Sequence, residues 1–138
     1  MIMKNILVFA TALFAAFILN SCATKMFFGI SPITPAAEGS AKIIKSKNGN
    51  SVLSVKVINL AEPQRLTPSQ KVYVVWSETN NGAAKNIGMI KISKGLFSKT
   101  LKGSFKTVCV IKPSRVFITA EDNGNVQYPG PQVVLKTK

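Results

Sequence analysis

The stretch KVYVVWSE at residues 71–78 decides the fold class of this chain. β-branched and aromatic residues dominate it, and such residues favour extended strands. Val72, Val74 and Trp76 share one face, while Tyr73 and Val75 share the other. Apolar residues on both faces are typical of a central strand that is covered on both sides. Trp76 and Tyr73 are therefore expected to pack in a core, with a ligand-stacking platform as the alternative.

The segments on either side of this stretch continue the two-residue period. Leu53, Val55 and Val57 alternate with polar residues, and so do Leu101, Gly103 and Phe105. Further strands are expected at residues 41–46, 89–93, 108–111, 115–120 and 132–136. Turn signals containing Asn-Gly separate several of these segments. This spacing predicts an all-β fold, an immunoglobulin-like antiparallel β-sandwich of about seven or eight strands over residues 40–138.

The beginning of the chain is typical of a targeting segment. The apolar run Ile6–Leu19 would span about 21 Å as a helix, short of the ~30 Å bilayer core but suitable for a secretory signal. It ends in Leu19-Asn20-Ser21-Cys22, which resembles the lipobox of bacterial lipoproteins. The resemblance implies a signal peptide at residues 1–21, lipidation of Cys22 and stable membrane anchoring. An uncleaved anchor and plain secretion are the alternatives.

The residues after Cys22 bear on localisation. No Asp follows Cys22 directly, and no acidic cluster is present there. By analogy with known lipoproteins, the outer membrane facing the periplasm is the expected location. Residues 22–39 are expected to be a linker, with Met26, Phe27 and Phe28 at the lipid–water boundary and a proline-containing spacer at Gly29–Gly39.

The composition excludes several function classes. The chain has 18 Lys+Arg, 5 Asp+Glu, no His and 2 Cys. Histidine-dependent triads and His-ligated metal sites are therefore impossible, and the few carboxylates leave little for acid–base catalysis. We expect no enzymatic activity, no metal and no cofactor. Nucleic acid is not expected as a partner, because the expected location is the cell envelope and no aromatic residues are interleaved with the basic ones.

The positive charge suggests one mode of binding. Removal of residues 1–21 deletes only Lys4 among the charged residues and lowers the net charge from +13 to +12. Lys56, Lys91, Lys102 and Lys106 fall on outward strand positions and are candidate polyanion-binding residues. Their partner would be a phospholipid, lipopolysaccharide or cell-wall polymer. The alternative is a solvated surface that protects edge strands from aggregation.

A second resemblance covers Val72–Leu135. It is carried by Tyr73-x-x-Trp76, Thr119-x-Glu121-x-x-Gly124 and Pro129-Gly130-Pro131-x-Val133-Val134-Leu135. This order is similar to the extracytoplasmic C-terminal domain of anti-sigma-K-type factors. The resemblance implies an immunoglobulin-like sandwich that binds or senses something on the envelope side. Members of that family carry a sigma-binding domain and a transmembrane helix before the sandwich, whereas a signal peptide is expected here, so no sigma binding is expected.

The expected function is a non-catalytic envelope interaction or sensory module that docks a protein partner, with electrostatic binding of an anionic envelope component as the alternative. The loop residues are the candidates for this docking. Tyr128, Pro129 and Gly130 precede the last expected strand, and Glu121 and Asp122 begin the oxygen-rich turn 121–125. Exposed loop aromatics are often functional, although this loop could also simply stiffen the start of the last strand. The 121–125 cluster is interpreted as a turn, because calcium requires more oxygen ligands. Cys109 is expected as a core residue, with a redox or dimer-forming thiol as the alternative.

Overall fold

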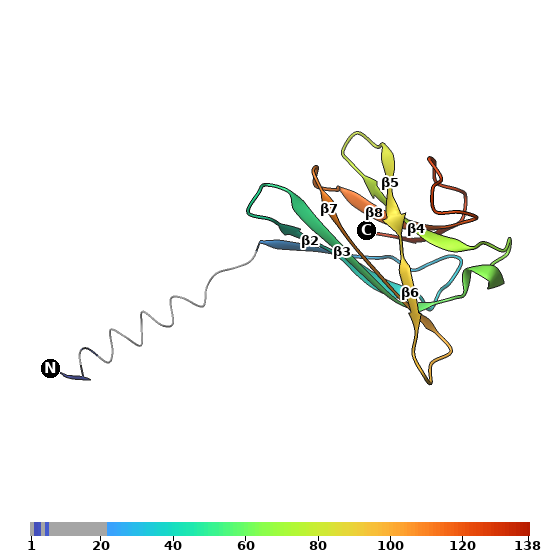
Figure 1. The fold of residues 1–138 in the computed structure, drawn as a ribbon, viewed down its shortest axis with the longest axis horizontal. Coiled ribbons are helices and arrows are strands. Elements are labelled where there is room, and N and C mark those ends of the chain that lie inside the picture. The colour runs from blue at the N-terminus through green and yellow to red at the C-terminus, as the bar shows by residue number, and fades with distance from the viewer. Residues whose placement is uncertain (1, 4, 6–21) are drawn as a thin grey trace.

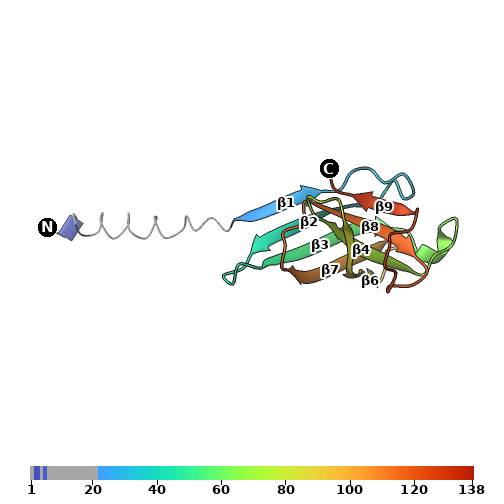
Figure 2. The ribbon, with the colours of Figure 1, turned by 90° about the horizontal axis from the view of Figure 1, so that it is seen from above.

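The structure is a computed structural model that describes residues 2, 3, 5 and 22–138. The predicted signal peptide therefore lies almost wholly outside the described residues, as do Leu19, Asn20 and Ser21 of the lipobox. Two antiparallel sheets of five and four strands pack face to face (Figures 1 and 2). Among the described residues, no helix is long and apolar enough to cross a membrane.

The five-stranded sheet has the order β1-β2-β3-β7-β6. Its strands are β1 (Ala23–Phe27), β2 (Glu38–Lys45), β3 (Ser51–Leu60), β7 (Leu101–Cys109) and β6 (Lys91–Lys94). The predicted alternation of β3 is confirmed, since Leu53, Val55 and Val57 face the core with at most 1% of their surface exposed. Gly49 adopts a φ of 81° in the turn between β2 and β3, a conformation that glycine tolerates.

The four-stranded sheet has the order β5-β4-β8-β9. Its strands are β5 (Ala84–Met89), β4 (Val72–Glu78), β8 (Arg115–Glu121) and β9 (Val133–Lys136). A short 3₁₀ turn, η1 (Pro63–Arg65), lies in the connection from β3 to β4. The orders β2-β3-β7-β6 and β4-β8-β9 match strands A-B-E-D and C-F-G of an immunoglobulin sandwich. The predicted fold class is confirmed.

Trp76 is buried, but on the outer face of its sheet. Tyr73 and Val75 join the core between the two sheets, whereas Trp76, Val74 and Phe117 form a second apolar cluster. The rings of Trp76 and Phe117 stack with centroids 6.1 Å apart and an interplanar angle of 10°. Trp76 and Tyr73 are thus both buried in an apolar cluster, as expected, but only Tyr73 packs between the two sheets. The stacked rings of Trp76 on β4 and Phe117 on β8 are buried in this second cluster, apart from the core between the sheets.

The segment after Cys22 differs from the expected linker. Residues 23–27 form β1, and Phe28 then pairs with Thr137 beside the other sheet. Met26 and Phe28 face the core, and Phe28 is only 8% exposed. The physical reason is the two-residue apolar spacing of Met26 and Phe28, only a few residues after Cys22. The folded unit thus begins near Ala23, ahead of the predicted boundary at residue 40, and the added β1 raises the described strands to nine.

Candidate functional site

The predicted partner-binding loop is held from beneath by Glu121. This residue is only 7% exposed. Its Oε1 atom accepts a hydrogen bond from the Thr119 hydroxyl at 2.6 Å and another from the backbone N–H of Gly130 at 2.7 Å. Glu121 was expected among the partner-binding residues, but its carboxylate faces inward because these donors satisfy it there. It positions the loop and does not lie on the loop surface.

The hydrogen bonds that Glu121 accepts from Thr119 and Gly130, here called the Glu121 clamp, continue into the apolar cluster of Trp76. Trp76 Nε1 donates to Thr119 Oγ1 at 2.8 Å, and that hydroxyl in turn donates to Glu121. Buried Trp N–H groups usually find such an acceptor. Gly130 also requires its small size, since a Cβ there would lie 2.7 Å from Glu121 Oε2. The loop is therefore tied to the centre of β4 through a continuous hydrogen-bonded chain.

Asn86 holds the other half of the same loop and was missed by the sequence analysis. Its Nδ2 donates to the carbonyls of Gly124 at 2.9 Å and Val126 at 2.8 Å. Its Oδ1 accepts from the N–H of Gly88 at 3.0 Å. Asn86 lies on β5, far from the loop in sequence, and only the fold brings it there. No local signal in the sequence distinguishes it from the other asparagines.

The remaining predicted loop residues are exposed. Tyr128 has 82% of its surface exposed, and Pro129 is also exposed. Asp122 lies at the surface and pairs with Lys71, whose Nζ is 3.1 Å from Asp122 Oδ1. Asn123 closes a local turn by accepting from the N–H of Asn125 at 2.9 Å. The loop thus presents Tyr128 and Pro129 from a fixed base, without Glu121.

The predicted polyanion-binding lysines gather on the outer face of the five-stranded sheet. Lys56 and Lys106 project from β3 and β7, and Lys91 and Lys102 from β6 and β7. Two further lysines, Lys25 and Lys42, lie on the same face. In the strand register Lys25 lies opposite Lys42, Lys42 opposite Ser54, and Ser54 opposite Lys106. We call this surface the Lys-rich face: Lys25, Lys42, Lys56, Lys91, Lys102 and Lys106.

A shallow groove of about 480 Å³ crosses the Lys-rich face. Lys25, Lys42, Lys56 and Lys106 line it, together with Ser40, Ser54, Ile44 and Val52. Two serines and two aliphatic residues therefore lie among the four lysines of the groove. This shape suits an extended polyanion that lies across the strands.

No ion pair of the described residues joins a lysine of this face to a carboxylate. All five acidic residues of the chain lie in the described range, and its ion pairs join Arg65, Lys71, Lys94 and Arg115 to acids elsewhere. Glu38 stands at one end of the face, on β2. Lys25 and Lys42 lie directly opposite each other on β1 and β2, an arrangement that is destabilising for like charges. Lys25 also lies 4.9 Å above the ring of Phe27.

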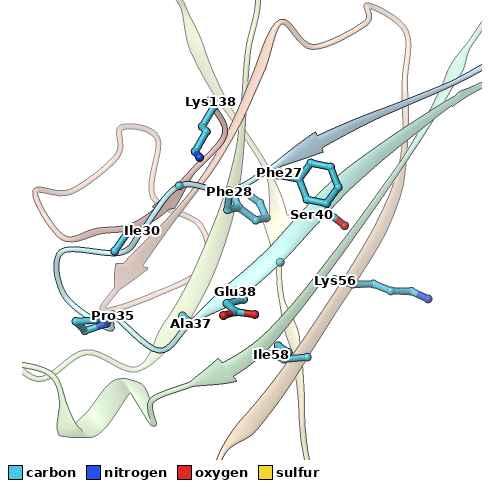
Figure 3. Close-up of a pocket in the computed structure, with 12 residues that line it drawn as sticks. Phe27, Phe28, Ile30, Pro35, Ala37, Glu38, Ser40, Lys56, Ile58 and Lys138 are labelled. Carbon is cyan, nitrogen blue, oxygen red and sulfur yellow. The ribbon is translucent and has the colours of Figure 1, made fainter.

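A pocket of about 560 Å³ opens beside the Lys-rich face, where β1 ends (Figure 3). Phe27, Phe28, Pro35 and Ile58 give it an apolar lining, and the Lys56 side chain extends away from the other labelled residues (Figure 3). Ser40 and Lys56 line both this pocket and the groove. The sequence analysis missed the pocket, because it assigned residues 29–39 to a spacer.

The two cysteines occupy different environments. Cys22 is exposed at the start of the continuous described segment 22–138, as lipidation would require. Cys109 is buried at the end of β7, and burial raises the pKa of its thiol, although the charge of Lys85 acts in the opposite direction. A raised pKa leaves less of the reactive thiolate at neutral pH. Cys109 therefore packs as a core residue.

The comparisons with known proteins add no assignment. Among the described residues, no cluster of Cys, Asp and Glu is arranged to hold a metal ion. No family model, no curated protein and no solved structure matches this chain.

Proposed function

We propose that this protein is a lipid-anchored, non-catalytic binding module of the bacterial cell envelope. Its anchor is Cys22, its expected location is the outer membrane facing the periplasm, and its Lys-rich face binds an anionic envelope component. The single observation that carries the binding proposal is the gathering of lysines on one sheet face. The exposure of Cys22, directly before β1, supports the anchor.

Electrostatics favour a polyanion as the ligand. Directly opposed lysines such as Lys25 and Lys42 repel each other in the free protein. An anionic chain in the groove would relieve this repulsion, so binding and sheet stability are coupled. Lysine supplies point charges without the bidentate geometry of arginine. We therefore expect recognition of charge density, with little discrimination between phosphate and carboxylate groups and strong weakening by salt.

The test compares two variants of equal net charge. The first carries Lys42→Gln, Lys56→Gln and Lys106→Gln on the Lys-rich face. The second, the matched control, carries Lys71→Gln, Lys85→Gln and Lys99→Gln elsewhere on the surface. Binding is measured at low and at physiological salt to two probes, namely vesicles that contain phosphatidylglycerol and soluble polyphosphate.

The face variant should bind either probe at least tenfold more weakly, if each lysine contributes on the order of 1 kcal/mol, while the control stays close to wild type. Preference for vesicles over polyphosphate would identify a lipid surface, and the reverse would identify a polymer. Equal losses in both variants would mean that only net charge matters, and the proposal for this face would fail.

The loop favours a second candidate function, docking of an envelope protein. Its support is the 82% exposure of Tyr128 on a loop that Glu121 and Asn86 hold in place. Exposed aromatics on rigid supports are common interaction anchors. The test is cross-linked co-purification from envelopes, washed at high salt. A defined partner that is retained by wild type and lost with Tyr128→Ala supports docking, and recovery of salt-labile lipid or glycan alone contradicts it.

A further inference from the structure

One end of the sandwich combines exposed aliphatic side chains with lysines. Val108, Val110 and Ile111 are 61%, 82% and 68% exposed, although each is strongly apolar. Val108 lies near the end of β7, and the other two begin the connection to β8. Exposed aliphatic residues in a group mark an interaction surface more often than isolated ones do.

Cys22 projects from the same end. In the strand register Ala23 lies opposite Ile44, Ile44 opposite Val52, and Val52 opposite Val108. The beginning of β1 and the end of β7 therefore lie at the same end of the sheet. Lys112 ties the connection to β1 by donating from Nζ to Thr24 Oγ1 at 3.2 Å. In Figure 2, the start of β1 and the turn between β2 and β3 lie at the same end of the sandwich.

Lysines surround the aliphatic group. Lys45 and Lys47 lie at the turn between β2 and β3. This turn lies at the same end of the sheet as the end of β7, because Ser51 at the start of β3 lies opposite Cys109. Lys112 lies in the connection itself. Glu78, which lies opposite Arg115 where β8 begins, is paired with that residue at 3.2 Å. The charge of this end is therefore positive, opposite to that of an anionic leaflet.

We infer that this end of the sandwich is a bilayer-docking tip, in which Val110 and Ile111 enter the interfacial region and Lys45, Lys47 and Lys112 bind lipid phosphates. This inference rests on the proposed lipid anchor at Cys22. It adds that the domain is held against the bilayer in one orientation and does not swing freely on its acyl chains. The anionic bilayer is the occupant because the tip joins apolar side chains, a cationic rim and the anchoring residue.

The test uses the full lipidated chain reconstituted in vesicles, with Cys109→Ala to remove the internal thiol. Ile111→Cys carries a polarity-sensitive thiol dye in one sample. In the matched control, Gln127→Cys carries the dye, in the loop at the opposite end of β8. Vesicles contain phosphatidylcholine alone or with phosphatidylglycerol, and nitroxide-labelled lipids report contact by quenching.

Docking predicts a blue shift and lipid quenching at position 111, and neither at position 127. Each exchange among Lys45→Gln, Lys47→Gln and Lys112→Gln should lower the ratio of docked to undocked protein about fivefold in anionic vesicles. Vesicle-bound protein with an aqueous signal at position 111 would overturn the tip and leave the anchor intact. Protein that does not stay with the vesicles would overturn the anchor itself.

Discussion

Removing the Glu121 carboxylate should release the loop and destabilise the domain. Glu121→Ala eliminates the acceptor of the 2.6 Å bond from Thr119 and of the 2.7 Å bond from Gly130. Hydrogen bonds to charged groups contribute about 1.5–3 kcal/mol each. The Thr119 hydroxyl keeps its bond from Trp76 and can turn to other partners, so part of the loss is recovered. We expect the free energy of unfolding to fall by about 2–4 kcal/mol.

Urea unfolding measures this loss, and amide exchange locates it. Glu121→Gln keeps an oxygen acceptor and should cost about 1 kcal/mol, because only the charge is lost. Asp122→Ala is the neighbouring control, since its ion pair with Lys71 is exposed and contributes under about 1 kcal/mol. Exchange should accelerate at residues 124–131 in Glu121→Ala before the strands open. If Glu121→Ala were as stable as Asp122→Ala and amide exchange at Gly130 were unchanged, the conclusion that Glu121 holds the loop in place would be refuted.

Further predictions concern the core. Burial raises the pKa of Tyr73 to about 12 from 10.0, so the neutral phenol stabilises the fold fully below pH 10 and this stability is lost as pH rises toward 12. Wild type should therefore lose about 2–3 kcal/mol relative to Tyr73→Phe over that range in pH-dependent urea unfolding, and parallel curves would contradict it. Gly103→Ala places a Cβ 2.6 Å from Ile90 Cγ2, so thermal unfolding should show a loss of about 1–3 kcal/mol, with Gly95→Ala as the tolerated control. Cys109 in a Cys22→Ser chain should react with a thiol reagent only after unfolding, and rapid reaction of the native protein would contradict its assignment to the core.

The sequence was sufficient for the sandwich but not for the position of Trp76. Alternation places Val72, Val74 and Trp76 on one face, as the structure has them, yet it does not say what covers that face. The cover comes from the 122–132 loop, whose Val126 packs on the Trp76 cluster. Loop conformation depends on distant partners such as Asn86, and a single sequence does not encode those contacts locally.

The Lys-rich face was predictable strand by strand but not as a surface. Alternation alone assigns Lys56, Lys102 and Lys106 to outward positions. Their grouping with Lys25 and Lys42 requires the register between strands and the existence of β1. Interpreting residues 22–39 as a linker removed β1 from the sheet, and with it Lys25 and the pocket beside Phe27. Glu121 was misjudged for a related reason, since burial depends on the loop folding back through Gly130.

The proposed polyanion binding by the Lys-rich face and the proposed bilayer-docking tip assign different roles to different rows of lysines. From the tip, the first lysine row is Lys25, Lys42 and Lys106, two residues beyond the Ala23 row and hence about 7 Å along the strands. Lys56 and Lys91 lie in the next row, about 13 Å from the Ala23 row. The Debye length is about 8 Å at physiological salt. A docked tip therefore brings the first row within reach of headgroup charges and leaves the next row screened from them. Exchanging Lys42 and Lys106 should weaken vesicle binding, whereas exchanging Lys56 and Lys91 should weaken polyphosphate binding alone. Equal effects of both exchanges on vesicle binding would mean that the sheet lies flat on the membrane and that the tip does not set its orientation.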